Sequence, residues 1–214
     1  GCIDPEALNY SEDATIDDGT CVYDSGPVAF EYTQSSMQAF YYIESVMIDN
    51  ISIDSEDWVG AFKDIDGDGI GDICVGSRRW DTAGCNNGIC EIALMGVDQF
   101  NLSETADYMN QGDIPVFMIY DQSENSFYDA KVLGENGYDF AALDYLWDFN
   151  TVHVMPELNA FYDCNQELGG HAFIDNCNYC VGGNTGLEEN FADIGCGCDE
   201  LAPSIYCEDT DDDG

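Results

Sequence analysis

The stretch from Asp64 to Asp72 carries carboxylates at a spacing that suits a hard cation. It reads Asp-Ile-Asp-Gly-Asp-Gly-Ile-Gly-Asp. Carboxylates at loop positions 1, 3 and 5 converge when a glycine at position 6 permits a sharp turn, and Ca²⁺ takes roughly six to eight oxygen ligands. Position 12, a glutamate in an EF-hand, is Val75 here, so the loop departs from that motif. A solvated acidic turn is the alternative. The predicted ligands are the side chains of Asp64, Asp66, Asp68 and Asp72 and the backbone carbonyl of Ile70.

Two further acidic clusters repeat parts of this spacing. One begins at Asp163 and is followed by Gly169 and Gly170, and the other is the Asp run at the C-terminal end. The predicted cofactor at both is again Ca²⁺, because both repeat the spacing of oxygen ligands found in the first loop. For the C-terminal run, a frayed acidic tail is the alternative. The predicted ligands are Asp163, Asn165, Glu167 and Asp175 in the first cluster, and Asp209, Asp211 and Asp213 in the second.

The charge balance limits the possible partners. The chain has 44 Asp and Glu against 4 Lys and Arg, which gives a formal net charge of −40. Repulsion on this scale destabilises a compact chain, so bound divalent cations or high external salt are expected to offset it. Nucleic acid and anionic membrane surfaces are not expected as partners, because phosphate binding needs Lys and Arg. Membrane insertion is not expected, because no apolar run approaches the roughly 20 residues that a span requires.

Eleven cysteines in 214 residues indicate an oxidising, extracellular compartment. A bridge between Cys2 and Cys21 would close an N-terminal loop that cannot bury a core, and Cys85 and Cys90 flank a tight turn. Cys74 is the odd cysteine, predicted to be a buried free thiol, with an intermolecular bridge as the alternative. Six C-terminal cysteines are predicted to form three bridges, in an order that spacing leaves open. These are Cys164, Cys177, Cys180, Cys196, Cys198 and Cys207.

Three segments divide the chain: a Cys-bounded acidic unit at 1–26, a β domain at 27–158, and a Cys- and Gly-rich module with an acidic tail at 159–214. The β domain is predicted to be an antiparallel sandwich or jelly roll, because short β-branched and aromatic runs alternate with turn residues. One short helix is expected, at Leu143–Phe149. The predicted strands are Val28–Thr33, Gln38–Ile48, Trp58–Phe62, Ile73–Ser77, Ile89–Leu94, Val116–Tyr120, Phe127–Val132 and Thr151–Met155.

No catalytic residues are predicted. His153 lies in an alternating apolar strand and His171 in the Cys-rich module, and neither forms a nucleophile–base pattern by spacing. A carboxylate pair for glycoside hydrolysis is a minor alternative, since an abundance of acids is not evidence for one. Three tryptophans are candidates for stacking against a glycan, with core packing as the alternative. They are Trp58, Trp80 and Trp147.

Several motifs resemble those of known protein families. The loop from Asp64 to Asp72 is similar to the DxDGDGxxD loops of thrombospondin type 3 and dockerin-type repeats. GCIDPEALNYSEDATIDDGTC and DCNQELGGHAFIDNCNYCVGGNTG resemble two repeats of large secreted Bacteroidota proteins, around an uncharacterised β domain that contains DWVGAF and DICVGSRRWDTAGC. The resemblance implies a secreted or cell-surface location and a role in adhesion or filament building. It also makes Thr82, within Asp-Thr-Ala, a candidate O-glycosylation site.

The expected function is that of an extracellular calcium-binding structural protein: a subunit of a bacterial surface filament or fibril, or a segment of a long adhesin. Its expected partners are further copies of itself, neighbouring modules of the same chain, and glycans. Strand addition from a neighbour's terminal segment is one way to polymerise such domains. The alternative is a calcium-dependent carbohydrate-binding module of a secreted enzyme. The chain itself is expected to be a piece of a longer precursor.

Overall fold

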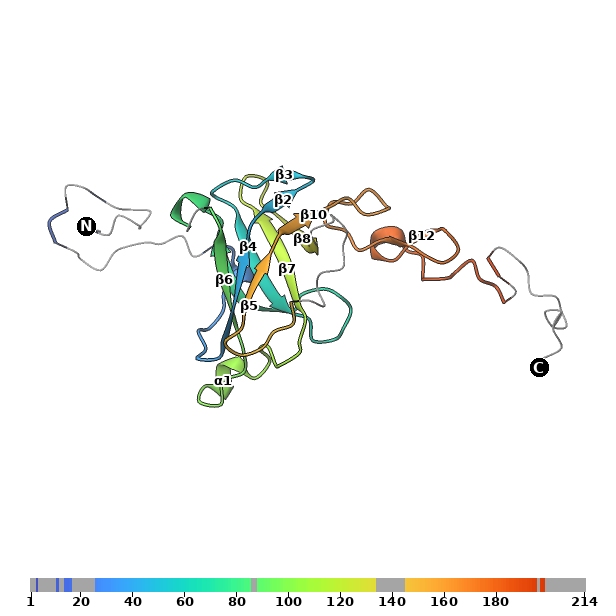
Figure 1. Ribbon diagram of the computed structural model, residues 1–214. Helices are drawn as coiled ribbons and strands as arrows, with labels where there is room; N and C mark the ends of the chain where they lie inside the picture. Colours follow the sequence, from blue (N-terminus) through green and yellow to red (C-terminus); the bar gives the residue numbers. More distant parts are fainter. Residues whose placement is uncertain are drawn as a thin grey trace.

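The computed structural model describes residues 26–195 apart from 86–87 and 134–144, together with residues 3, 11, 14–16, 197 and 198. Its central part is a mainly β domain from which a narrow C-terminal module extends (Figure 1). The predicted fold class, a β-sandwich-like domain with a disulfide-rich module, is therefore confirmed.

Twelve strands and four short helical segments make up the described elements. The strands are β1 (Gln38–Ile43), β2 (Val46–Ile48), β3 (Ile51–Ser52), β4 (Trp58–Lys63), β5 (Ile73–Arg79), β6 (Cys90–Met95), β7 (Pro115–Asp121), β8 (Ser126–Leu133), β9 (Val152–Met155), β10 (Glu157–Ala160), β11 (Phe173–Ile174) and β12 (Cys180–Val181). The helical segments are the 3₁₀ turns η1 (Val28–Phe30), η2 (Thr82–Gly84) and η4 (Gly183–Thr185), and the single-turn helix α1 (Leu102–Thr105).

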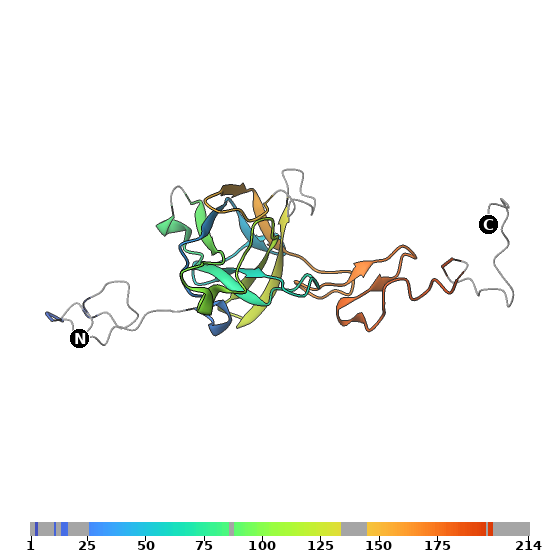
Figure 2. The ribbon, with the colours of Figure 1, turned by 90° about the horizontal axis from the view of Figure 1, so that it is seen from below.

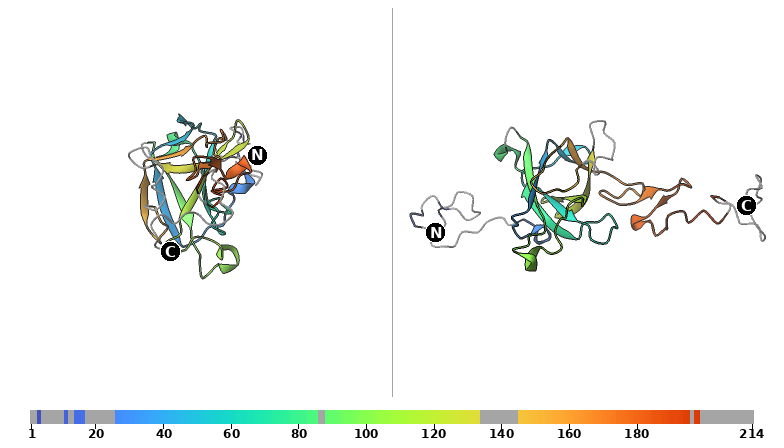
Figure 3. Two further views of the ribbon diagram at one scale, coloured as in Figure 1. Left: turned by 90° about the vertical axis from the view of Figure 1, so that its right-hand side faces the viewer. Right: turned by 60° about the horizontal axis from the view of Figure 1, so that its bottom comes forward.

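The β domain consists of two sheets that enclose one core. Three strands form the order β6-β1-β9, and seven form the order β3-β2-β10-β8-β7-β4-β5. The sheets meet where β5 adjoins β6: the Arg78 guanidinium donates to the carbonyl of Glu91, 3.2 Å away. Figure 3 shows the resulting ring of strands around the interior.

Two strand pairings depart from the predicted antiparallel arrangement. β1 runs parallel to β9, and β2 runs parallel to β10. Both long segments pass from one sheet to the other in the same direction, β1 to β2 through Glu44 and Ser45, and β9 to β10 through Pro156. Backbone bonds span the break, with Glu44 N–H donating to Met155 and Leu158 N–H donating to Ser45, each at 2.9 Å. The break between β1 and β2 also divides the single strand predicted over Gln38–Ile48.

Alternation along the strands builds the core, as the sequence pattern requires. In β1, Ala39, Tyr41 and Ile43 are fully buried, while the residues between them are half-buried. β4 differs because five consecutive residues are buried. Its outer face is covered by Phe30 of η1, whose ring lies 5.4 Å from that of Phe62. This covering explains why β4 is a continuous apolar run.

Two predicted elements are wrong. Val28–Thr33 is not a strand: Val28–Phe30 forms the 3₁₀ turn η1 after Pro27, and Phe30 is directed into the apolar cluster over β4. Leu143–Phe149 is not a helix over its described part, residues 145–149. There, Trp147 exchanges extended backbone bonds with Gly112 and Asp113, each at 2.9 Å, and places its indole in the core.

The module that follows β10 extends away from the sandwich (Figure 2). Its secondary structure is the two-residue pair β11 and β12 and the turn η4. β10 belongs to the seven-stranded sheet, although it was not among the predicted strands. The last strand of the β domain therefore ends at Ala160. Such a thin module buries little apolar area, so covalent staples must contribute much of its stability.

Candidate metal centre

The loop between β4 and β5 holds the most concentrated group of carboxylates in the described structure. The two strands are antiparallel, with Lys63 opposite Ile73, so the ends of the loop lie side by side. The Asp72 N–H donates to the Lys63 carbonyl at 2.9 Å and closes the base. Asp64 and Asp72 are therefore brought together by the hairpin, although they lie eight positions apart in the chain.

Local hydrogen bonds fold the loop inward. The Asp64 carboxylate accepts the N–H groups of Gly67 at 2.7 Å and Gly69 at 2.8 Å. Both glycines have positive φ, 81° and 86°, which side chains with a Cβ rarely adopt. Asp72 in turn accepts the N–H of Ile65 at 2.7 Å. The glycines predicted to permit the sharp turn therefore have that role.

Three carboxylates converge at the centre of the loop. Asp64, Asp66 and Asp72 each offer an oxygen atom, and these atoms lie within 4.8 Å of one another. Oxygens around one Ca²⁺ at about 2.4 Å can be separated by up to about 4.8 Å, so the spacing fits a single ion. In the part of the chain that the structure describes, no other group of His, Cys, Asp or Glu meets this criterion.

The remaining predicted ligands of this loop stand at its tip. Asp68 is exposed and its carboxylate accepts the N–H of Ile70 at 2.8 Å, so it lies outside the converging trio. Ile70 is 43% exposed. Val75, at position 12, is fully buried in β5 and supplies no ligand. The loop therefore supplies three clustered carboxylates, and water or further donors would complete the coordination shell.

The second predicted cluster is not brought together in the same way. The Asp163 carboxylate accepts the N–H groups of Asn165, Glu167 and Ala172 at 2.8 to 2.9 Å. Although partial burial raises the pKa of Asp163, these bonds and nearby His171 outweigh it and lower the pKa below its usual value. Asp163 thus organises the backbone of the module.

Asp175 has a similar backbone role. Its carboxylate accepts from Cys177 and Tyr179 at 2.9 Å and from Asn190 at 3.1 Å, and the residue is 7% exposed. Glu167 is engaged separately, by the Asn184 amide. Calcium at this second cluster gains no support from these contacts.

Several predicted site residues lie outside the described residues. They are the third calcium cluster, Asp209, Asp211 and Asp213, and the cysteines Cys2, Cys21, Cys196 and Cys207. Their predicted roles stay predictions.

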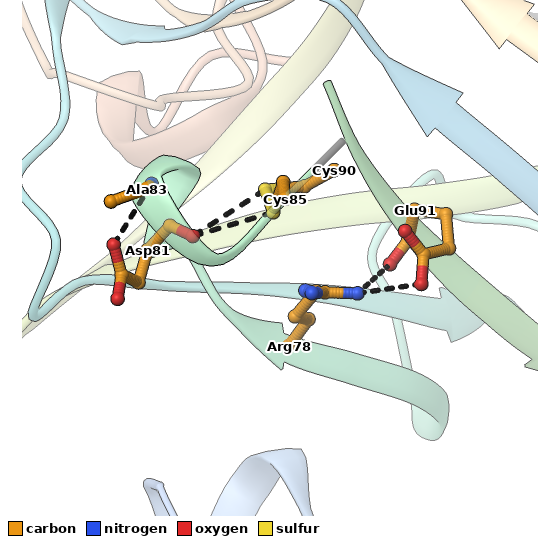
Figure 4. The surroundings of a disulfide bond; sticks show 6 residues. All are labelled: Arg78, Asp81, Ala83, Cys85, Cys90 and Glu91. Atoms are coloured by element: carbon orange, nitrogen blue, oxygen red, sulfur yellow. Dashed lines mark hydrogen bonds and ion pairs between the residues drawn. A yellow bond between two sulfur atoms is a disulfide. The ribbon is translucent and has the colours of Figure 1, made fainter. Parts of the chain in front are cut away.

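Three disulfides are present in the described structure. Cys85 and Cys90 are bonded as predicted (Figure 4). In the C-terminal module, Cys164 pairs with Cys180 and Cys177 with Cys198, which selects one partial connectivity among those that spacing left open. Disulfides at this density are typical of extracellular proteins.

The surroundings of the Cys85–Cys90 bridge are polar. Asp81 caps η2 by accepting the N–H of Ala83 at 3.0 Å. Arg78 pairs with Glu91 at 2.8 Å on the adjoining strands (Figure 4). Thr82, the candidate glycosylation site, is exposed on η2, and its modification stays a prediction.

Cys74 is a free, buried thiol, as predicted. It is 6% exposed, its sulfur lies 3.4 Å from the Phe30 carbonyl, and burial raises its pKa to about 11. Only about one thiol in a thousand is then ionised at pH 8, and the thiolate is the reactive form.

We expect Cys74 to resist iodoacetamide at pH 8 in the folded chain and to react fully in denaturant, as measured by peptide mass spectrometry. Rapid labelling of Cys74 without denaturant would contradict its assigned burial.

The three tryptophans that were candidates for stacking against a glycan are core residues. Trp58, Trp80 and Trp147 are 9%, 4% and 3% exposed, so no indole face is open to a sugar ring. The Trp147 N–H donates to the Leu94 carbonyl at 3.0 Å. All three rings belong to the apolar clusters of the domain, which is the alternative that the sequence left open.

The two histidines have separate structural surroundings. His153 of β9 packs against the Tyr41 ring at 4.6 Å, and burial lowers its pKa. His171 contacts Asp129 of β8 through Nε2. No local sequence pattern links His171 with Asp129, because the two residues lie 42 positions apart.

No protein family, curated protein or solved structure matches this chain in comparisons with known proteins. None of the helices in the described part of the chain is long and apolar enough to span a membrane.

Proposed function

We propose that this chain is an extracellular calcium-binding structural protein, either a subunit of a bacterial surface filament or a segment of a long adhesin. The observation that carries the proposal is the convergence of Asp64, Asp66 and Asp72 on the β4–β5 loop. An all-oxygen, carboxylate-rich site of this kind favours Ca²⁺ over softer transition metals.

Charge supports a bound cation. Three of the chain's four Lys and Arg residues are engaged elsewhere: Lys63 pairs with Asp113 at 2.9 Å, Arg78 with Glu91, and Arg79 with Glu56. The carboxylates of the loop therefore lack these cations as counter-charges. A divalent ion would cancel two negative charges at the point where three carboxylates are closest.

The covalent framework supports an extracellular, load-bearing role. Two disulfides hold the thin C-terminal module, Cys164–Cys180 and Cys177–Cys198, and a third closes the loop before β6. A module that keeps its shape without a large core suits a spacer or connector between larger domains. Secretion is consistent with these bridges, which persist in oxidising compartments.

Self-association is the proposed use of this framework. Chains of net charge −40 repel one another at long range, so contact between copies requires the charge to be reduced or screened. Calcium on the exposed β4–β5 loop lowers that charge and is proposed to permit assembly.

Sedimentation velocity and electron microscopy test this proposal directly. With millimolar calcium we expect the chain to form ordered oligomers or fibrils at high concentration, and with chelator to sediment as a monomer. Asp66→Asn is expected to reduce assembly, because Asn keeps the hydrogen bond to the Asp68 N–H but loses the charge. Asp107→Asn is the matched control: Asp107 is exposed and lies outside the loop. Monodisperse monomers at high concentration with calcium would count against the filament role.

A further inference from the structure

The junction between the β domain and the C-terminal module rests on a small set of contacts with β8. Gly169 has a φ of 66°, and a Cβ placed there would lie 2.7 Å from the Asp129 nitrogen. The module's backbone therefore packs directly on β8 at this point. Beside it, His171 Nε2 contacts Asp129 Oδ2 across the same junction.

This histidine contact lies partly out of solvent. The His171 side chain is 32% exposed and that of Asp129 is 19% exposed. The second carboxylate oxygen, Asp129 Oδ1, is buried and has no hydrogen-bond partner among the described residues. A carboxylate held this way has lost much of its hydration, so a neighbouring cation stabilises it more than it would a fully exposed one.

The charged groups around His171 are mostly acids. Asp129 and Lys131 face the junction from β8, while Asp163 and Glu167 face it from the module. Asp68 approaches from the β4–β5 loop, which extends toward the module in Figure 2. Asp68, Asp129, Glu167 and His171 line one cavity of about 580 Å³ between domain and module. A positive charge on His171 therefore has acids on three sides.

We propose that His171 and Asp129 form a protonation-dependent latch that holds the C-terminal module against β8. An ionised carboxylate only accepts hydrogen bonds, so the Nε2 atom of His171 carries the hydrogen in this contact. Loss of the Nδ1 proton then removes the positive charge of the imidazolium and leaves a weaker, neutral hydrogen bond. The latch is firm when His171 is charged and loosens when its imidazolium loses a proton. It requires no metal and is independent of the proposed calcium function.

Nuclear magnetic resonance relaxation of backbone amides, recorded with chelator at pH 5.5 and pH 8, tests the latch. At pH 5.5 the module's amides are expected to share the tumbling time of the β domain, and at pH 8 to show a larger contribution from independent motion. The undocked population should rise about fivefold, which is the typical difference between a charge-assisted and a neutral hydrogen bond.

Two variants and a control make the result specific. His171→Gln keeps an N–H donor but cannot gain charge, so the pH dependence should disappear and the module should be mobile at both pH values. Asp129→Asn should have the same effect from the other side. His153→Gln is the matched control, because His153 lies on β9 and packs against Tyr41, away from the junction.

Three outcomes would overturn the proposal. These are co-tumbling of module and domain at both pH values, a pH dependence that survives His171→Gln, and one that disappears in His153→Gln. The disulfides Cys164–Cys180 and Cys177–Cys198 hold the module internally, and an amide spectrum that retains the module's dispersion verifies that each variant is folded.

Discussion

Calcium at about one hundred times its dissociation constant is expected to stabilise the folded chain by about 2.7 kcal/mol relative to chelator. For a chain of this length, such a gain raises the melting temperature by about 5 to 10 °C. The reason is linkage: the converging carboxylates of Asp64, Asp66 and Asp72 exist as a group only when β4 and β5 are paired. Thermal unfolding followed by circular dichroism measures the shift.

The effect of Asp66→Asn on stability is expected to reverse between chelator and calcium. In chelator, the variant should be as stable as the natural chain or slightly more so, because it removes one of three mutually repelling charges. In calcium it should be less stable, because it has lost a charged ligand. Asp107→Asn should keep the full calcium shift, since Asp107 is exposed and outside the loop.

Screening must be separated from specific binding. Sodium chloride at matched ionic strength lowers repulsion over the whole surface, because the Debye length falls as salt rises. It should stabilise the natural chain and Asp66→Asn alike. Equal melting temperatures with calcium and with chelator, at matched ionic strength, would contradict a calcium site in the β4–β5 loop.

The β4–β5 loop shows what sequence spacing can predict. Its chemistry depends on residues within nine consecutive positions, so the types and spacing of Asp and Gly carry most of the information. The spacing did not predict the position of each carboxylate in the loop. Asp68 is at the tip, while Asp64 and Asp72 are at the base. That division follows from the hairpin, which places the two ends of the loop together.

Longer-range features were less predictable. The parallel pairing of β1 with β9 joins residues more than one hundred positions apart, and nothing in either strand's alternation specifies direction. Likewise, the sequence could not tell whether the Asp163 carboxylate would bind an ion or backbone N–H groups, because both uses favour an Asp before a tight turn. The contact of Asp129 with His171 depends on how the module docks, which no local pattern encodes.

The burial of Trp147 leads to the largest expected loss of stability from one substitution. Its indole is 3% exposed, donates to the Leu94 carbonyl at 3.0 Å, and covers Gly96, where an added Cβ would collide with the ring. Trp147→Ala leaves a cavity and removes one hydrogen bond from the Leu94 carbonyl. We expect a loss of about 3 to 5 kcal/mol from the cavity and about 1 kcal/mol more from the hydrogen bond. Equilibrium denaturation in guanidinium chloride measures it.

Phe149→Ala is the matched control for Trp147→Ala. Phe149 lies two residues further along the chain and is 51% exposed, so its truncation should change stability by no more than about 1 kcal/mol. The comparison also decides between the two uses of an aromatic ring in this segment. Removing a core tryptophan lowers the unfolding midpoint, whereas removing a ring of a glycan platform would weaken only glycan binding. An unchanged midpoint for Trp147→Ala would therefore contradict the burial of Trp147 in the core.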